Sequence, residues 1–319
     1  MKGFFYSVLV LCFLAAGFVW WASSEFTSPG PLEEPATLVF PAGDRFTQIT
    51  ETLAAQKVIA HPFLFEVLVF ARGESSKFKA GEYTFPAHIT AFDVATMIAG
   101  GKTVVHKLTI AEGLMTSEIL ELVKQAPALD GEVTLDPKEG ELLPETYNYS
   151  RGDKRNDIIT RMRHAMQKTL AEAWTGRADG LPLTTPEQAL TLASIVEKET
   201  SLTDERPHVA SVYINRLKKS MLLQADPTTA YAVTMGTHKL ARPLSLADLQ
   251  LDSPYNTYHS AGLPPGPIAN PGRASILATL HPIASDDLYF VATGTGGHNF
   301  ARTQAEHEAN VKKYRALGH

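Results

Sequence analysis

Two glutamates, Glu197 and Glu199, follow an apolar run in the second half of the chain. If that run is helical, residues two apart lie about 200° apart around the axis, so the two carboxyls cannot share one site. Glu199 lies on the same face as Ile195 and Val196, at the end of the run. Burial and the negative end of the helix dipole both favour a protonated carboxyl there. Glu199 is therefore a candidate general acid.

The helix that must position Glu199 carries clear signals at its start. Thr185 is a good N-cap, Pro186 fits the first helical position, and Gln188 completes a capping box. Apolar residues at 190–196 then cover most of the circumference, which predicts a buried helix. The alternative interpretation of Glu199 is a helix-end salt bridge with Lys198, Arg206 or Arg216.

Composition limits the function classes. The 319 residues, 44% hydrophobic and 20% charged, suffice for two domains with their own cores. A net charge of −5 argues against nucleic acid as a partner. The single cysteine, Cys12, excludes an intrachain disulfide and a Cys-ligated zinc site. The histidines of the second half lack the short helical spacing of a metalloprotease motif, so we expect neither a metal nor a cofactor.

The N-terminal segment predicts a membrane anchor. Residues 3–22 are apolar and uncharged, and about 20 such residues span a bilayer. Lys2 precedes the segment and glutamates follow it, which favours a cytoplasmic N-terminus. Trp20 and Trp21 stand where an interfacial aromatic belt is expected, and they make a poor signal-peptide cleavage site, the alternative interpretation. We therefore expect an uncleaved anchor at residues 1–23.

Residues 24–35 are polar and rich in proline, and predict an extended linker. Strand–turn–helix patterns then recur at residues 37–55, 83–99 and 107–123. Any small α+β domain has this pattern, but the units also resemble LysM domains. Residues 36–105 are therefore predicted to form a LysM-like subdomain.

The remaining chain, residues 106–319, predicts a larger α+β domain. Residues 156–174 have the apolar spacing of a long amphipathic helix. The stretch 251–272 is a long loop rich in proline and glycine with apolar groups to pack, and we interpret it as functional.

Several motifs of this domain resemble the endolytic murein transglycosylases, the MltG-like family. They occur in family order between residues 139 and 311, and they are EGELLPETY at 139–147, ASIVEKET at 193–200, ERPHVASVYINRL at 205–217, LQADPT at 223–228, SPYNTY at 253–258, GLPPGPI at 262–268, YFVA at 289–292 and GGHNF at 296–300. The membrane anchor and the LysM-like segment agree with the architecture of that family.

The resemblance implies a lyase that cuts peptidoglycan glycan strands. In that family the second glutamate of EKET is the catalytic acid and base, which is Glu199, and Glu197 is then structural. Glu199 would protonate the oxygen between N-acetylmuramic acid and N-acetylglucosamine, and the C6 hydroxyl of the muramic acid would attack its own C1. The product is a 1,6-anhydro end. Endolytic cutting of nascent strands and association with peptidoglycan synthases are implied by the resemblance alone. An inner (cytoplasmic) membrane location, with the catalytic domain outside the cytoplasm, agrees with the predicted anchor.

Six polar residues are candidates for substrate binding, with packing or turn formation as the alternative for each: Gln224, Asp226, Tyr255, Asn256, Tyr258 and Asn270. Two other functions stay open from the sequence. One is a non-catalytic peptidoglycan-binding scaffold at the inner membrane, and the other is a hydrolase that uses water in place of the C6 hydroxyl.

Overall fold

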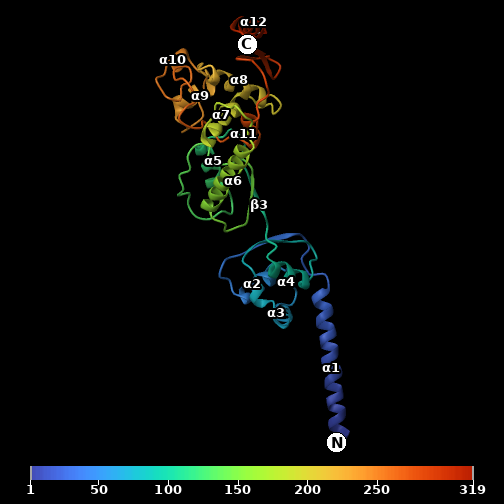
Figure 1. Ribbon diagram of the computed structural model, residues 1–319. Helices are drawn as coiled ribbons and strands as arrows, with labels where there is room; N and C mark the ends of the chain where they lie inside the picture. Colours follow the sequence, from blue (N-terminus) through green and yellow to red (C-terminus); the bar gives the residue numbers. More distant parts are fainter. Residues whose placement is uncertain (1, 318–319) are drawn as a thin grey trace. The chain divides into compact units, whose positions relative to one another are not determined.

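The computed structural model describes residues 2–317 and has the predicted mixed α+β character, with three two-stranded sheets in that range (Figure 1). The chain forms two compact units, Met1–His106 with Asn148–Gly152 and Lys107–Tyr147 with Asp153–His319. Met1, Gly318 and His319, which belong to the expected anchor and catalytic domain, lie outside the described residues. The unit boundary falls within β3 (His106–Thr109) and β4 (Thr146–Tyr149), which pair with each other.

The N-terminal unit is a small sheet covered by helices. Its elements are α1 (Lys2–Thr27), β1 (Ala36–Phe40), α2 (Phe46–Ala55), α3 (Pro62–Ala71), the 3-10 turn Ser75–Lys77, β2 (Gly81–Phe85) and α4 (Ala91–Gly100). The two strands are antiparallel, with Leu38 opposite Tyr83. Alternation along β2 buries Tyr83 and Phe85 and exposes Thr84, so one sheet face carries the core.

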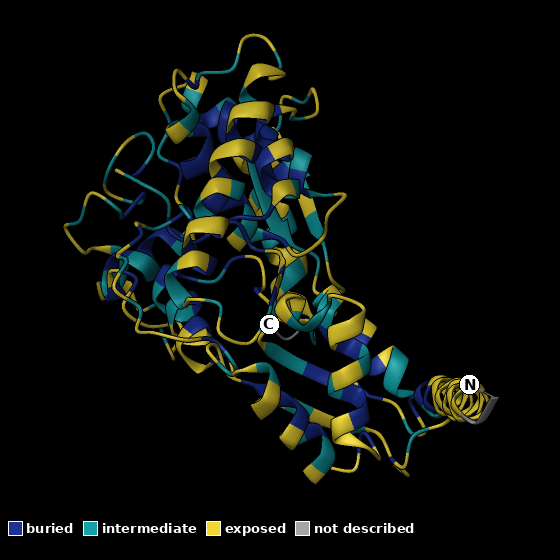
Figure 2. Ribbon diagram, turned by 90° about the horizontal axis from the view of Figure 1, so that it is seen from below, coloured by how far each residue is buried: buried dark blue, intermediate teal, exposed yellow. Residues whose placement is uncertain are grey.

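Helix α1 matches the predicted anchor. Residues Phe4–Thr27 form a candidate membrane span with a mean hydropathy of 2.1, and Figure 2 shows the helix end-on with its surface exposed. The expected linker differs from the structure. Residues 24–35 stay helical up to Thr27, and Phe26 and Leu32 are buried in the core of the N-terminal unit. The segment is packed although its composition is rich in proline, because burial of the Phe26 and Leu32 side chains stabilises a packed conformation over an extended one.

The C-terminal unit is mainly helical. Its elements are α5 (Thr116–Gln125), α6 (Arg155–Thr175), α7 (Pro186–Glu199), α8 (Arg206–Lys218), α9 (Asp226–Thr234), α10 (Leu246–Leu249), α11 (Arg273–Leu280), β5 (Tyr289–Ala292), β6 (His298–Ala301) and α12 (Gln304–Ala316). Helix α7 is central and packs against α6, α8, α9 and α11. Eight consecutive residues, 189–196, are buried, as the apolar circumference predicts.

The start of α7 confirms the predicted N-cap. The Thr185 hydroxyl accepts a hydrogen bond from the backbone N–H of Gln188, 3.3 Å away. The Gln188 side chain does not close a capping box on Thr185. Its Oε1 accepts instead from the N–H of Thr184 at 2.7 Å, so the side chain of Gln188 bonds the residue before the N-cap and not the N-cap itself.

Candidate active site

Glu199 is the last residue of α7, and its carboxyl has a raised pKa. Burial raises that pKa from the ordinary 4.5 to about 7, and the negative charge of Asp226 adds to the effect. The Tyr213 hydroxyl, which donates to Glu199 Oε1 at 2.6 Å, and the Arg216 charge act in the opposite direction. Because Oε1 is engaged as an acceptor, Oε2 is left to carry the proton. The carboxyl is therefore suited to donate that proton near neutral pH.

Two of the three cations considered as salt-bridge partners of Glu199, Lys198 and Arg206, have other partners. Lys198 donates to the carbonyl of Gly113 at 3.1 Å, and Arg206 pairs with Glu197 at 2.9 Å. Glu197 also accepts from the N–H of Gly272 at 2.9 Å, which agrees with a structural role on the opposite side of α7. The structure thus separates the two glutamates as the helix geometry predicts.

A pocket of about 280 Å³ opens beside Glu199. Its lining combines two carboxylates with other polar, cationic and aromatic side chains, so polar groups converge on a concave site. The lining residues are Glu199, Tyr213, Arg216, Leu223, Gln224, Asp226, Tyr258, Phe290 and His307. Four of them, Glu199, Gln224, Asp226 and Tyr258, are among the residues predicted from the sequence.

Arg216 connects the segments that form the pocket. It lies one helical turn after Tyr213 on α8, so both side chains share a face. Its Nε donates to the carbonyl of Leu288 at 2.6 Å and its Nη1 to that of Leu223 at 2.7 Å. The first bond fixes the entry to β5 and the second fixes the turn before α9. A buried guanidinium with carbonyl partners also keeps a positive charge near the Glu199 carboxyl.

Gln224 and Asp226 enter the pocket from the turn before α9. Gln224 has a φ of +49°, in the left-handed region that residues other than glycine rarely adopt. Its N–H donates to the carbonyl of Thr257 at 3.1 Å, which ties this turn to the long loop 251–272. That loop supplies Tyr258, whose hydroxyl donates to Asp226 Oδ1 at 2.5 Å. Strained backbone of this kind is found preferentially at functional sites.

The β5–β6 hairpin and α12 complete the pocket with Phe290 and His307. The Phe290 ring meets Tyr213 edge-on, with ring centroids 5.8 Å apart. The hairpin is hydrogen-bonded to Glu205, the residue before α8. Glu205 Oε1 accepts from the backbone N–H of His298 at 2.9 Å, and Glu205 Oε2 lies 2.8 Å from the Nδ1 of His298. His307 stacks on Tyr289, and burial lowers the pKa of its imidazole.

Three predicted substrate residues lie elsewhere. Asn256 and Asn270 are fully buried, and protein groups use their amides. Asn256 accepts from the N–H of Tyr258 at 3.2 Å and donates to the carbonyls of Leu249, at the end of α10, and of Leu251, so it shapes the loop that carries Tyr258. Asn270 accepts from the N–H of Leu142 and donates to Leu114, Thr116 and Glu139. Tyr255 packs on the core and against Tyr231, with ring centroids 4.9 Å apart. Direct substrate contact is therefore replaced by a positioning role for the two asparagines.

Sequence reasoning missed Tyr213, Arg216, Leu223, Phe290 and His307 as pocket residues. Tyr213 and Arg216 carried a usable signal, because they are three residues apart and therefore share one face of a helix with the apolar residues Val209 and Val212. Phe290 and His307 carried none, since a strand phenylalanine and a helical histidine are common in any domain.

Comparison with known proteins agrees with this geometry. A family model described as the YceG-like family matches residues 38–313. The endolytic murein transglycosylase of Bacillus subtilis (strain 168) is 33% identical over 305 residues, which cover 86% of this chain and 83% of the relative. The endolytic murein transglycosylase of Streptococcus pneumoniae serotype 2 is 29% identical, with 98% of this chain aligned to 65% of that protein.

A solved structure supports the same assignment. The crystal structure of a YceG-like protein from Listeria monocytogenes is similar to this chain with a TM-score of 0.53 and 32% sequence identity. The match covers 87% of this chain and 99% of that one. The family model and the bacillus relative each cover most of the chain, so the protein belongs to the YceG-like family.

Proposed function

We propose that this protein is a lytic transglycosylase of peptidoglycan, a lyase, and that Glu199 is its catalytic acid. Membership of a family whose curated members are named endolytic murein transglycosylase supports the reaction class. The observation that carries the assignment of the acid is the Glu199 carboxyl, which lines a pocket and has a pKa of about 7.

In the proposed reaction Glu199 acts first as an acid and then as a base. Its proton passes to the glycosidic oxygen between N-acetylmuramic acid and N-acetylglucosamine as the bond to C1 breaks. The C6 hydroxyl of the same muramic acid attacks C1 and gives its proton to the Glu199 carboxylate. This closes the 1,6-anhydro ring and restores the acid. The nucleophile is already attached to the substrate, so its positioning requires little additional loss of entropy.

The other pocket residues suggest how a strand is held. Gln224 and Tyr258 offer hydrogen-bonding groups, and the Phe290 ring offers an apolar surface for a sugar face. Asp226 has two effects in this proposal. Its charge helps to keep Glu199 protonated, and its carboxylate accepts from Tyr258, which orients that phenol at the pocket wall.

Helix α1 fits a single-pass membrane anchor. We propose that it lies in the cytoplasmic membrane with both units on the outer side, where peptidoglycan is found. Association with peptidoglycan synthases extends this proposal and is supported by the family resemblance alone. Crosslinking in intact cells followed by isolation of the full-length protein tests it, and recovery of no synthase contradicts it.

The decisive experiment digests purified sacculi with the full-length protein, its Glu199→Gln variant and a matched Glu187→Gln variant. Glu187 is an exposed residue in the first turn of the same helix. Products are identified by mass spectrometry, in which a hydrolysed end is heavier than an anhydro end by about 18 Da, one water. We expect anhydro ends from the wild type and from Glu187→Gln, and none from Glu199→Gln.

Other outcomes contradict separate parts of the proposal. Formation of anhydro ends by the Glu199→Gln variant at the wild-type rate would show that Glu199 is not the catalytic acid. Hydrolysed ends would identify a hydrolase, for which Asp226 offers the second carboxylate in the same pocket. Binding to sacculi without cleavage by the wild type would indicate a scaffold.

A further inference from the structure

Helix α3 carries an exposed apolar stripe. Phe63, Val67 and Phe70 are 77%, 46% and 75% exposed, and their spacing of four and three residues places them on one face. The opposite face is buried through Leu64, Phe65 and Val69. A surface with two largely solvent-exposed phenylalanines is uncommon in a soluble domain and indicates an interaction site.

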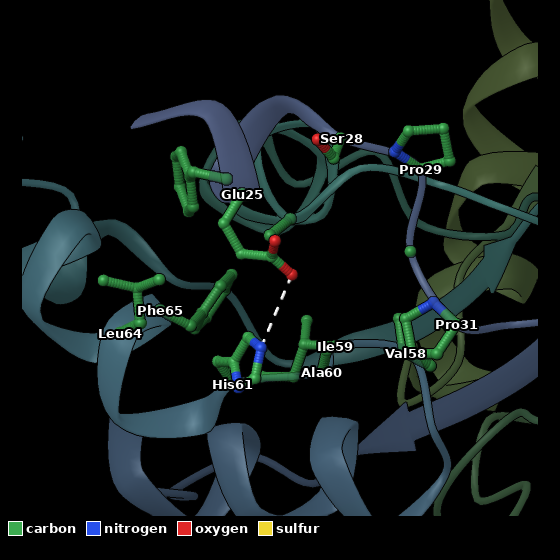
Figure 3. A pocket seen from close by; sticks show the side chains of 13 residues that line it. Glu25, Ser28, Pro29, Pro31, Val58, Ile59, Ala60, His61, Leu64 and Phe65 are labelled. Atoms are coloured by element: carbon green, nitrogen blue, oxygen red, sulfur yellow. Dashed lines mark ion pairs between the residues drawn. The ribbon is translucent and has the colours of Figure 1, made fainter. Parts of the chain in front are cut away.

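The stripe begins beside the anchor helix. The Trp21 ring of α1 lies 6.1 Å from the imidazole of His61, the residue just before α3. Figure 3 shows the side chains of Glu25 of α1 and His61 pointing toward each other at the edge of a pocket. His61 Nε2 lies 3.5 Å from Glu25 Oε1. Phe26, one residue further along α1, packs against Phe65 of α3 with ring centroids 6.1 Å apart. The N-terminal end of α3 is therefore held at the level of Trp21.

That level coincides with the expected membrane surface. Residues 3–22 of α1 are about 30 Å long as a helix, the thickness of the hydrocarbon core, so the core ends near Ala22. Trp20 and Trp21 then lie in the interfacial layer, where tryptophan is enriched. No spacer follows, because Ala22 and Phe26 are already buried against the N-terminal unit. In Figure 1, α3 lies at the edge of this unit from which α1 descends.

We propose that α3 is an interfacial helix whose face of Phe63, Val67 and Phe70 inserts into the lipid surface beside α1. The proposal rests on α1 crossing the membrane. Such helices bury their apolar side about 5–10 Å into the boundary between headgroups and acyl chains. The only charged residue within α3 is Glu66, so the attraction is apolar and needs no anionic lipid. The N-terminal unit is thereby fixed at two points instead of one.

The test measures lipid contact at single positions of the full-length protein in phosphatidylcholine vesicles. Cys12 is replaced by serine, and an environment-sensitive fluorophore is attached at Phe63→Cys or Phe70→Cys. The matched control is Thr84→Cys, an exposed strand position on the sheet face opposite the core. Wild-type protein labelled at Cys12, its only cysteine, reports on α1. Quenching at positions 63, 70 and 84 is measured with lipids that carry a spin label near the headgroup, and quenching at Cys12, the midpoint of residues 3–22, with lipids that carry the label near the end of the acyl chain.

We expect emission at positions 63 and 70 to be shifted to shorter wavelength and quenched by the spin-labelled lipid, at low and high salt alike. Position 84 should behave as in water. Water-like emission at 63 and 70, while Cys12 is quenched, overturns the proposal but leaves the anchor intact. Shifted emission without lipid quenching overturns it in favour of a protein contact, such as a second copy. An unquenched label at Cys12 overturns the anchor and the proposal together.

Discussion

Replacing Glu199 by glutamine is expected to stabilise the protein above neutral pH. The pKa of this carboxyl is about 7 in the folded protein against an ordinary 4.5. Between these values the folded state binds a proton that the unfolded state has lost, so the free energy of unfolding falls as pH rises. At about 1.4 kcal/mol for each pH unit, the ionised carboxyl lowers that free energy by about 3 kcal/mol at alkaline pH. Glutamine has no charge to bury, so the variant escapes this loss.

Urea unfolding at two pH values measures the effect. Trp174 packs on the core of the C-terminal unit and reports on that unit once Trp20 and Trp21 are replaced by phenylalanine. Compared with the same background, Glu199→Gln should gain about 3 kcal/mol at about pH 8.5 and almost nothing at about pH 4.5. An equal gain at both pH values, or a loss at alkaline pH, would refute the argument that a buried, raised-pKa carboxyl occupies this position.

Glu197→Gln is the matched control, two residues away on the same helix. Its side chain is 4% exposed and pairs with Arg206, which is 6% exposed. Removing that charge leaves a buried guanidinium with Glu112 as its remaining carboxylate partner. We expect a loss of about 2 kcal/mol at about pH 8.5, opposite in sign to the effect at Glu199. A gain at both positions would show that the stabilisation is a general response to fewer charges on α7.

Four further substitutions test the pocket and its support. Tyr213→Phe removes a hydrogen bond that favours ionised Glu199, so it should move the alkaline limb of the pH profile of product formation upward by about one pH unit. Asp226→Asn removes a charge that disfavours the ionised form and should move the limb downward. An unmoved limb in both variants contradicts the electrostatic account. Gln224→Gly should raise the thermal midpoint by relieving a left-handed backbone, worth about 1 kcal/mol, while turnover of sacculi falls, and a lowered midpoint argues against strain. Asn270→Ala leaves the buried N–H of Leu142 without its partner and removes the amide bonds to Leu114, Thr116 and Glu139, so it should lower the free energy of urea unfolding by about 3 kcal/mol. A neutral result would mean that water replaces the amide.

Much of the fold could be predicted from local patterns. The strand–turn–helix pattern at residues 37–55 coincides with β1 and α2, and the helix predicted at 156–174 matches α6 to within one residue at each end, because the apolar spacing is regular. Helix α3 was not predicted. It is apolar on nearly every side, so it has no polar face to reveal a period. The prediction of an extended linker at residues 24–35 differs from the structure, because the burial of Phe26 and Leu32 depends on partners that are distant in the sequence.

The site could be predicted in part. Glu199 followed from helix geometry alone, and Gln224, Asp226 and Tyr258 followed from polar groups in turns. The asparagines mark the limit of that reasoning, because a buried amide that organises a loop and an exposed amide that binds a sugar have the same sequence signature. Only the hydrogen bonds of Asn256 and Asn270 distinguish the two.

The residues of the pocket are far apart along the chain. Glu199 and His307, at its two sequence extremes, are separated by 108 positions, 307 minus 199. A nascent chain that has emerged only as far as α8 holds the glutamate without the turn, the loop and the hairpin that remove its carboxyl from water. Such a carboxyl has an ordinary pKa and is ionised at neutral pH. A partly folded chain therefore lacks the raised-pKa carboxyl that the proposed reaction requires, and this acid is assembled only when folding of the C-terminal unit is complete.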